Sequence, residues 1–424
     1  MEEIIGRDAV QKERWGIKGC GYIGKVVSYP GGRYEEVGRV YLDLATPHCM
    51  LVVGKRGTGK SYTLGVIAEA FQMLEEDVRS KISMIIVDTL GVFHSLKVPN
   101  NVPDEVAMLE KHGLKPFGLE DNVRVFVPEI AKALAKRYGA NMYSDAKLCI
   151  PLASVNAYDW IKLLGIEPQS DEGIVLMKLY ADEHPLKFED LYDGLSRLQT
   201  RFDQAVAYLE EVFRIFENTG LFSNGYVGDY SVITGGKISV LDMTGLGNVG
   251  GYDLRALVVG CIARDLLRKR MLYSTLQMQE TAGLTTAPKE DFPLVYMMID
   301  EAHLFVPSDA SAISTAPLID WVKLGRHPGL SLILATQEPS ALHTSAIRQA
   351  DIIIAHNVTS YDDIVALKKA KQSYMGDKGV DVMASTMEFR RGLAAIFDDK
   401  NRKCIMCKIR PRCTLHTGMD AVAL

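Results

Sequence analysis

Residues 54–61 of this 424-residue chain read Gly-Lys-Arg-Gly-Thr-Gly-Lys-Ser, the pattern of a phosphate-binding P-loop. An apolar run at 49–53 leads into this segment, and a helical pattern follows it from Ser61 to about Met73. A strand, a glycine loop and a helix in this order are the context that a P-loop requires. The pattern predicts an α/β fold with a RecA-like P-loop NTPase core, in which a mostly parallel sheet is flanked by helices.

The chemistry of a P-loop assigns roles to its residues. Glycines let successive backbone N–H groups converge on phosphate oxygens at the positive end of the following helix. Lys60 is expected to neutralise charge on the β- and γ-phosphates, and the Ser61 hydroxyl to ligate Mg²⁺. We therefore predict ATP and Mg²⁺ as cofactors. The residues expected to bind the nucleotide are Gly54, Lys55, Arg56, Gly57, Thr58, Gly59, Lys60, Ser61 and Tyr62.

A second apolar run ends in two carboxylates, Asp300 and Glu301. An acidic pair at a strand end is usually a solvated turn, but in a chain with a P-loop it marks the place where Mg²⁺ is held and water is polarised. Asp300 is predicted to contact the metal shell. Glu301 is predicted to be the general base that orients the attacking water.

Two further polar residues flank the run 330–335. Gln337 follows it and is interpreted as a sensor of the γ-phosphate, with a surface glutamine that caps the strand as the alternative. Arg326 lies in a glycine-flanked turn before it. From the residues alone, Arg326 is equally well an arginine finger or a surface cation.

The rest of the chain divides by pattern. We predict a short β-rich N-terminal segment at 1–45 (a reduced barrel), a first part of the ATPase core at 46–130, a helical insertion at 131–225 and a second part of the core at 226–424. Within the last part, a helix is expected at about 254–272. A mobile, polar loop is expected at 274–290.

Composition narrows the cellular setting. Neither a secretory signal nor an apolar run long enough for a bilayer is evident, so we expect a cytoplasmic protein without a membrane partner. The formal net charge of −5 does not decide about nucleic acid, because a ring can enclose a basic channel within an acidic exterior. The basic run Arg264, Arg268, Lys269 and Arg270 is expected to be a solvated helix face.

Four C-terminal residues, Cys404, Cys407, Cys413 and His416, suggest a zinc site. However, residues 404–410 alternate in the way an ordinary strand does. We expect no zinc there and reduced thiols throughout.

The order of the motifs resembles the HerA-like branch of the HerA/FtsK superfamily. The resemblance covers most of the chain from about Arg39 and rests on Val-Val-Gly-Lys-Arg-Gly-Thr-Gly-Lys-Ser-Tyr-Thr, Met-Ile-Asp-Glu-Ala-His, Leu-Gly-Arg-His-Pro-Gly-Leu-Ser-Leu-Ile-Leu-Ala-Thr-Gln-Glu-Pro-Ser and Ile-Arg-Pro-Arg-Cys-Thr-Leu-His-Thr-Gly. By this resemblance, Arg326 matches an arginine that acts on the neighbouring subunit's nucleotide. Gln337 matches the polar residue after the fourth core strand.

The resemblance implies a homohexameric ATPase that translocates double-stranded DNA through a central channel, with a NurA-type nuclease as a partner. Two departures stand out. The family commonly carries an acidic residue in the turn after its second strand, whereas this turn reads Asp88-Thr-Leu-Gly-Val-Phe93. We also expect the amino-terminal barrel of the family to be reduced, because only about 45 residues precede the P-loop strand.

Three functions remain open at this point. The leading one is a ring-shaped DNA translocase or helicase that acts in DNA end processing. A virus-genome packaging or conjugative DNA-transfer ATPase would share the same core. A nucleotide-controlled assembly scaffold would bind ATP without translocation, but the presence of Glu301 and Arg326 favours turnover.

Overall fold

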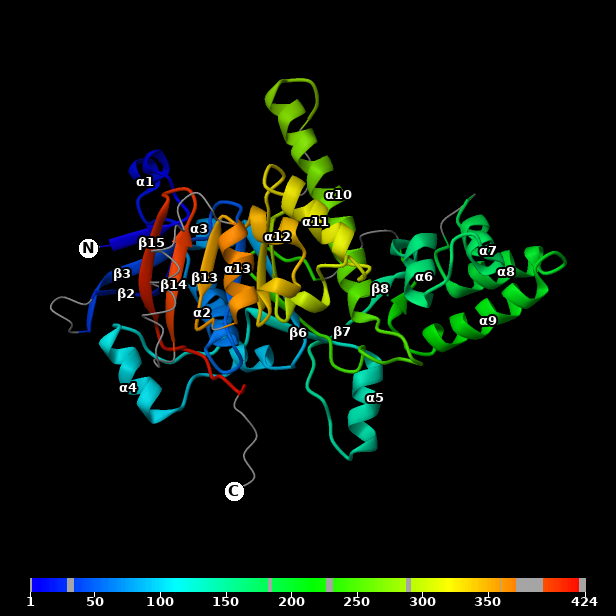
Figure 1. Ribbon diagram of the computed structural model, residues 1–424, viewed down its shortest axis with the longest axis horizontal. Coiled ribbons are helices and arrows are strands. Elements are labelled where there is room, and N and C mark those ends of the chain that lie inside the picture. The colour runs from blue at the N-terminus through cyan, green and yellow to red at the C-terminus, as the bar shows by residue number, and fades with distance from the viewer. Residues whose placement is uncertain are drawn as a thin grey trace.

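A computed structural model of the chain describes residues 2–28, 34–181, 185–225, 232–286, 291–358, 360–370 and 392–418. Within these ranges, 13 strands form one sheet in the order β1-β3-β2-β15-β14-β13-β4-β12-β11-β5-β10-β6-β7 (Figure 1). Its strands are β1 (Glu2–Ile5), β2 (Cys20–Ser28), β3 (Glu35–Asp43), β4 (Cys49–Val53), β5 (Ile82–Asp88), β6 (Val123–Val127), β7 (Ala146–Lys147), β10 (Ile238–Asp242), β11 (Leu294–Ile299), β12 (Leu330–Thr336), β13 (Ile352–Ala355), β14 (Leu393–Asp398) and β15 (Lys403–Ile409).

The centre of the sheet is parallel, which confirms the predicted fold class. Strands β13, β4, β12, β11, β5, β10, β6 and β7 all pair in parallel. Buried β-branched and other apolar residues fill these strands because both faces of the sheet are covered. The carboxyl ends of the parallel strands consequently meet at one edge, hereafter the carboxyl edge.

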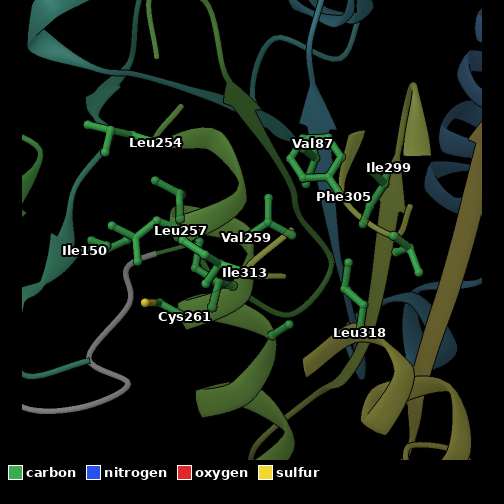
Figure 2. Close-up of a cluster of buried hydrophobic side chains, with 14 of the residues drawn as sticks. Val87, Ile150, Leu254, Leu257, Val259, Cys261, Ile299, Phe305, Ile313 and Leu318 are labelled. Carbon is green, nitrogen blue, oxygen red and sulfur yellow. The ribbon is translucent and has the colours of Figure 1, made fainter. Parts of the chain in front are cut away.

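Helices cover both faces of the sheet. Apart from four helices at 157–217, the α-helices of the described residues are α1 (Ala9–Trp15), α2 (Lys60–Gln72), α3 (Glu76–Arg79), α4 (Pro103–Lys111), α5 (Glu129–Arg137), α10 (Arg255–Thr281), α11 (Thr315–Leu324), α12 (Thr344–Gln349) and α13 (Tyr361–Ala370). One face of the sheet packs against α2, which contributes Leu64, Ile67 and Phe71 to the core. The other packs under α10, whose Leu257 and Val259 belong to the same core as Val87 and Ile299 (Figure 2).

The predicted helical insertion contains α6 (Ala157–Leu164), α7 (Asp171–Leu179), α8 (Phe188–Leu198) and α9 (Asp203–Glu217), which gather beyond one end of the sheet (Figure 1). Trp160 of α6 stacks on Phe216 and meets Phe213 edge-on, so aromatic packing holds these helices together. The predicted helical insertion is not purely helical, because it also contains short strands. It carries β7 and also β8 (Ile150–Pro151), which pairs with β9 (Phe222–Ser223).

The N-terminal strands are part of the main sheet. Strand β2 pairs with β15, and β3 pairs with β2 and β1. The segment is β-rich, as predicted, but it extends the sheet through the C-terminal hairpin β14–β15 instead of standing apart. The domain boundaries given above stay a prediction.

Helix α10 is longer than predicted. It continues to Thr281, so residues 274–281 are helical and not a loop. This stretch contains leucine, glutamine, methionine and glutamate, which favour helix, and the first glycine after it is Gly283 with φ +73°. Residues 282–286 contain turns and bends and no helix, in agreement with the predicted loop, and 287–290 lie outside the described residues. The second half of α10 projects beyond the body of the protein (Figure 1).

A buried charge network lies at the edge opposite the carboxyl edge. His48 is fully buried between two carboxylates, with Nδ1 2.8 Å from Asp351 Oδ2 and Nε2 3.4 Å from Asp43 Oδ2. Asp43 also accepts a hydrogen bond from Arg7 Nη2 at 3.0 Å. Burial lowers the pKa of His48, but the two carboxylates raise it more, so its pKa lies above the usual value of 6.5.

The stability of the fold should therefore fall as pH rises above neutrality. A histidine whose pKa is raised on folding contributes stability that is fully present below its unfolded pKa of about 6.5 and is lost as pH rises through the folded pKa. His48→Gln should lower the free energy of unfolding by about 3–5 kcal/mol at pH 6 and less at higher pH. Urea unfolding of this variant and of an exposed control, His94→Gln, at several pH values measures the difference. Equal losses at pH 6 and pH 9 would contradict a charged His48.

Candidate nucleotide site

The P-loop connects β4 to α2 at the carboxyl edge. Gly54, Gly57 and Gly59 have positive φ angles of 156°, 72° and 116°, so the backbone follows a path that other residues rarely adopt. A Cβ at Gly54 would lie 2.7 Å from the Cβ of His356. Helix α2 begins after Gly59 without a side-chain cap, so its first N–H groups point out of the helix with no acceptor within it. The loop is thus shaped to receive an anion.

Lys60 is buried at the start of α2. Its Nζ donates a hydrogen bond to the carbonyl oxygen of Lys55 at 3.0 Å, which bends the side chain back over the loop. Burial lowers the pKa of Lys60, while Glu301 and Asp300 act in the opposite direction. Lys55, Arg56 and Gly57 form the exposed crest of the loop.

Asp300 follows β11 and meets the P-loop helix. Its Oδ2 accepts a hydrogen bond from Ser61 Oγ at 3.0 Å, and its Oδ1 accepts one from the backbone N–H of Glu301 at 3.0 Å. Burial and the neighbouring Glu301 raise the pKa of Asp300. A hydroxyl and a carboxylate oxygen in contact are hard ligands of the kind that Mg²⁺ prefers.

Glu301 adopts a left-handed backbone conformation with φ 51° and ψ 51°. Such a conformation in a non-glycine residue costs about 1–3 kcal/mol and is often found at functional sites. Its Oε1 accepts a hydrogen bond from Gln337 Nε2. Its Oε2 is buried, lies 3.5 Å from His303 Nδ1 and has no hydrogen-bond partner among the described residues. One oxygen of Glu301 is therefore free to accept a proton.

Gln337 reaches this group because β12 pairs with β11 and β4 in register. Ile299 faces Leu334, and Val53 faces Thr336, so the residues that follow these strands converge. Gln337 is only partly exposed and donates to Glu301. Gln337 therefore contacts Glu301, whereas the alternative interpretation made it a surface residue that caps β12.

Tyr62 extends the site away from the acidic pair. Its hydroxyl donates to Glu105 Oε2 at 3.2 Å and accepts from the backbone N–H of Arg412 at 2.7 Å. The His416 ring meets the Tyr62 ring edge-on. Tyr62 thus joins α2 to the C-terminal segment.

Arg326 does not join this group. It is exposed in the turn that precedes β12, whereas Gln337 follows the same strand. The seven residues of β12, at about 3.3 Å each, separate the two ends by about 20 Å. Arg326 therefore lies at the edge opposite its own P-loop, and its guanidinium is too far away to contact a nucleotide bound there.

Sequence reasoning missed His356, which follows β13 at the carboxyl edge. Its ring is fully buried, with Nε2 2.8 Å from Thr63 Oγ1 and Nδ1 3.1 Å from the carbonyl oxygen of Leu393. Burial lowers its pKa to about 4, so the ring is neutral and holds α2 against β13. Its position as a polar residue directly after an apolar strand was the available signal.

The side chain of Asp88 organises the turn after β5. Asp88 accepts hydrogen bonds from the backbone N–H groups of Leu90, Gly91 and Phe93 at 3.2, 2.8 and 2.7 Å. Burial raises its pKa to about 7, and the charges of Asp242 and Asp300 contribute. Asp242 ends the neighbouring strand β10 in register with Asp88. Asp242 and Asp300 are thus close enough to Asp88 at the carboxyl edge to raise its pKa.

The cysteines of the C-terminal strand point in different directions. Cys404 is exposed and Cys407 is buried, as the alternation along β15 requires. Within the described ranges, no three metal-ligating side chains gather in a way that would hold an ion. No helix in those ranges is long and apolar enough to span a bilayer.

The comparisons with known proteins agree with this geometry. The family model described as the central domain of helicase HerA matches residues 22–246, which are more than half of the chain. The chain belongs to the HerA family. The match spans the P-loop, β5, the helical block and β10, and the chain is accordingly an ATPase of HerA type.

A curated HerA relative extends the match. It is the probable DNA double-strand break repair helicase HerA of Methanocaldococcus jannaschii, 24% identical over 386 residues that cover 82% of this chain and 69% of that protein. Among solved structures, VirB4 of Thermoanaerobacter pseudethanolicus shares the fold with a TM-score of 0.53 at 13% identity, covering 92% of this chain and 96% of that one. The bacterial conjugative coupling protein TrwB has a TM-score of 0.47 at 13% identity, with 89% of each chain covered.

Proposed function

We propose that the protein is an ATP-dependent, ring-forming translocase of double-stranded DNA, with six copies in the ring and a role in DNA end processing. The main support for the proposal is the placement of the predicted site residues at two opposite edges of the sheet. Lys60, Ser61, Asp300, Glu301 and Gln337 gather at the carboxyl edge, while Arg326 lies about 20 Å away at the opposite edge. A complete site therefore needs the carboxyl edge of one copy to meet the opposite edge of another. Head-to-tail contacts of this kind form a ring when the rotation between successive copies closes.

The residues at the carboxyl edge have separate roles in hydrolysis. Lys60 exchanges its contact with the Lys55 carbonyl for the β- and γ-phosphates of ATP, which the N–H groups of 54–61 surround. Ser61 and Asp300 would hold Mg²⁺, which when bound neutralises negative charge on the phosphates. Glu301 accepts a proton from the attacking water on its free Oε2. Gln337 fixes the carboxylate through Oε1 and responds to the γ-phosphate.

Lys60→Ala should weaken ATP binding by about ten- to a hundredfold and reduce turnover below detection. The substitution removes a cation whose charge-assisted bonds contribute about 1.5–3 kcal/mol each. Titration with a fluorescent ATP analogue and a phosphate-release assay measure the two effects, with the exposed Lys323→Ala as the matched control. Normal ATPase activity of Lys60→Ala would overturn the nucleotide site.

The DNA partner follows from family membership and from the curated relative, a repair helicase. A genome-packaging or DNA-transfer ATPase would share the same hydrolytic site and would likewise respond to duplex DNA. A NurA-type nuclease partner stays a prediction from the family resemblance, and a cytoplasmic location stays a prediction from the sequence composition. A nucleotide-controlled scaffold is the alternative from another class, since it would hydrolyse ATP without regard to DNA.

Stimulation of the ATPase by DNA distinguishes a motor from a scaffold. Phosphate release by the full chain should rise when linear double-stranded DNA is added, and the rise should fall with increasing salt because phosphate contacts release counterions. Single-stranded DNA of the same length is the comparison. A rate that stays constant with either DNA would contradict translocation. Sedimentation in the presence of ATP measures whether six copies assemble.

A further inference from the structure

Arg270 is the buried member of the basic run in α10. Its side chain is only 4% exposed, whereas its neighbours Arg268 and Lys269 are exposed. The expectation that this run is a solvated face was therefore wrong for Arg270. It was also wrong for Arg264, which is largely buried and pairs with both carboxylate oxygens of Asp159.

The partners of Arg270 are unusual for a buried cation. Its Nε donates to the carbonyl oxygen of Pro328 at 2.6 Å, and its Nη1 donates to that of Phe292 at 2.5 Å. The guanidinium also lies over the rings of Tyr273 and Phe292, at 5.2 and 5.8 Å. Burial lowers its pKa, and no carboxylate pairs with it within the described ranges. Among the described residues, backbone carbonyls and aromatic rings hold the cation.

Pro328 belongs to the turn that carries Arg326. The turn closes with a bond from the N–H of Gly329 to the carbonyl oxygen of Arg326 at 3.3 Å. Gly329 has φ +88°, and a Cβ there would lie 2.9 Å from Arg270 Nη2, so the turn packs directly against the guanidinium. Four residues further along α10, Ser274 Oγ lies 3.5 Å from Nδ1 of His327 in the same turn. One face of α10 thus contacts the turn at two successive helical positions.

We propose that Arg270 is the positioning residue for the Arg326 turn: it fastens the turn, through Pro328, to the projecting helix α10. The proposal rests on the proposed function, in which Arg326 acts on the nucleotide of a neighbouring copy. Arg326 itself is exposed and stands in a turn, so its direction depends on what holds the turn. Arg270 supplies a planar group that can donate to two carbonyls at once, which lysine cannot do in the same geometry.

The consequence for catalysis is specific. Arg270 touches neither its own P-loop nor any residue at the carboxyl edge, so losing it should leave ATP binding intact. Misplacement of a catalytic group by about 1 Å can cost about a hundredfold in rate. Arg270→Met, which removes the donors but keeps an unbranched chain, should lower kcat by about a hundredfold with an unchanged KM for ATP. Arg268→Met, on the exposed face two residues earlier, should leave both values unchanged.

Mixed assemblies separate positioning from general damage. If Arg270 acts through the finger, its defect falls on the neighbour's site, and Arg270→Met subunits retain an intact P-loop. Mixing them with Lys60→Ala subunits, which retain an intact Arg270 and Arg326, should restore part of the ATPase activity. Copurification of differently tagged subunits verifies that the two variants assemble together.

The outcomes decide between the roles. A wild-type rate for Arg270→Met, or mixtures that stay inactive while Arg326→Ala mixtures recover, would overturn the positioning role alone. A wild-type rate for Arg326→Ala would instead remove the finger and with it this inference. If Arg270→Met does not fold, as judged by thermal unfolding, Arg270→Lys takes its place, with an expected loss in kcat of about tenfold from one lost charge-assisted bond. An unchanged kcat for Arg270→Lys would then contradict the inference.

Discussion

Arg326→Ala should bind ATP normally, assemble normally and hydrolyse ATP at least about a thousandfold more slowly than the wild-type protein. Arginine fingers stabilise charge that develops on the transferring phosphoryl group, so their loss affects the rate and leaves ground-state affinity largely intact. The permanently charged, planar guanidinium suits this task better than lysine. Because Arg326 lies at the edge opposite its own P-loop, we expect it to serve the nucleotide site of a neighbouring copy.

A steady-state phosphate-release assay gives kcat, and nucleotide titration gives affinity. Lys323→Ala, an exposed cation on the preceding helix, is the matched control and should behave as wild type. Mixtures of Arg326→Ala with Lys60→Ala should recover activity at interfaces that pair an intact P-loop with an intact arginine. A wild-type rate for Arg326→Ala alone, or mixtures that form but stay inactive, would show that the finger assignment is wrong.

Glu301→Gln should still bind ATP but turn it over about a hundred- to ten-thousandfold more slowly, the range that general-base catalysis contributes. Glutamine preserves the shape of the side chain and can keep one bond to Gln337, but it cannot accept a proton from water. The free Oε2 of Glu301 is the atom whose chemistry changes. The nucleotide should therefore remain trapped as ATP.

Single-turnover measurements, which follow one round of bound ATP, isolate the chemical step for this variant. Asp320→Asn, an exposed carboxylate on α11, is the control for the loss of one negative charge. Hydrolysis by Glu301→Gln at the wild-type rate would show that another group activates the water.

The sequence predicted the parallel centre of the sheet because that information is local. Each strand there is an apolar run, and the residue after it stands at the carboxyl edge, so Lys60, Asp300 and Gln337 could be expected to converge. His356 obeys the same rule and could have been found by applying it to β13.

Other features depend on contacts between distant segments. The pairing of β2 with β15 joins the two ends of the described chain, and no local pattern encodes which edge strand meets which. Arg270 belongs to a run of basic residues that looks solvated, and only the packing of α10 against the turn at Pro328 distinguishes it from Arg268. The end of α10 was misjudged because its polar residues resemble a loop, although its leucine, glutamine, methionine and glutamate residues favour helix.

Displacement of a third strand from duplex DNA tests the central claim most directly, because it reports movement along the duplex and not binding or hydrolysis alone. The account predicts that the wild-type protein removes a triplex-forming strand in the presence of ATP. Glu301→Gln, or the wild-type protein with a non-hydrolysable analogue, should leave it in place. Steady ATP hydrolysis in the presence of this substrate, with the third strand fully retained, would contradict translocation.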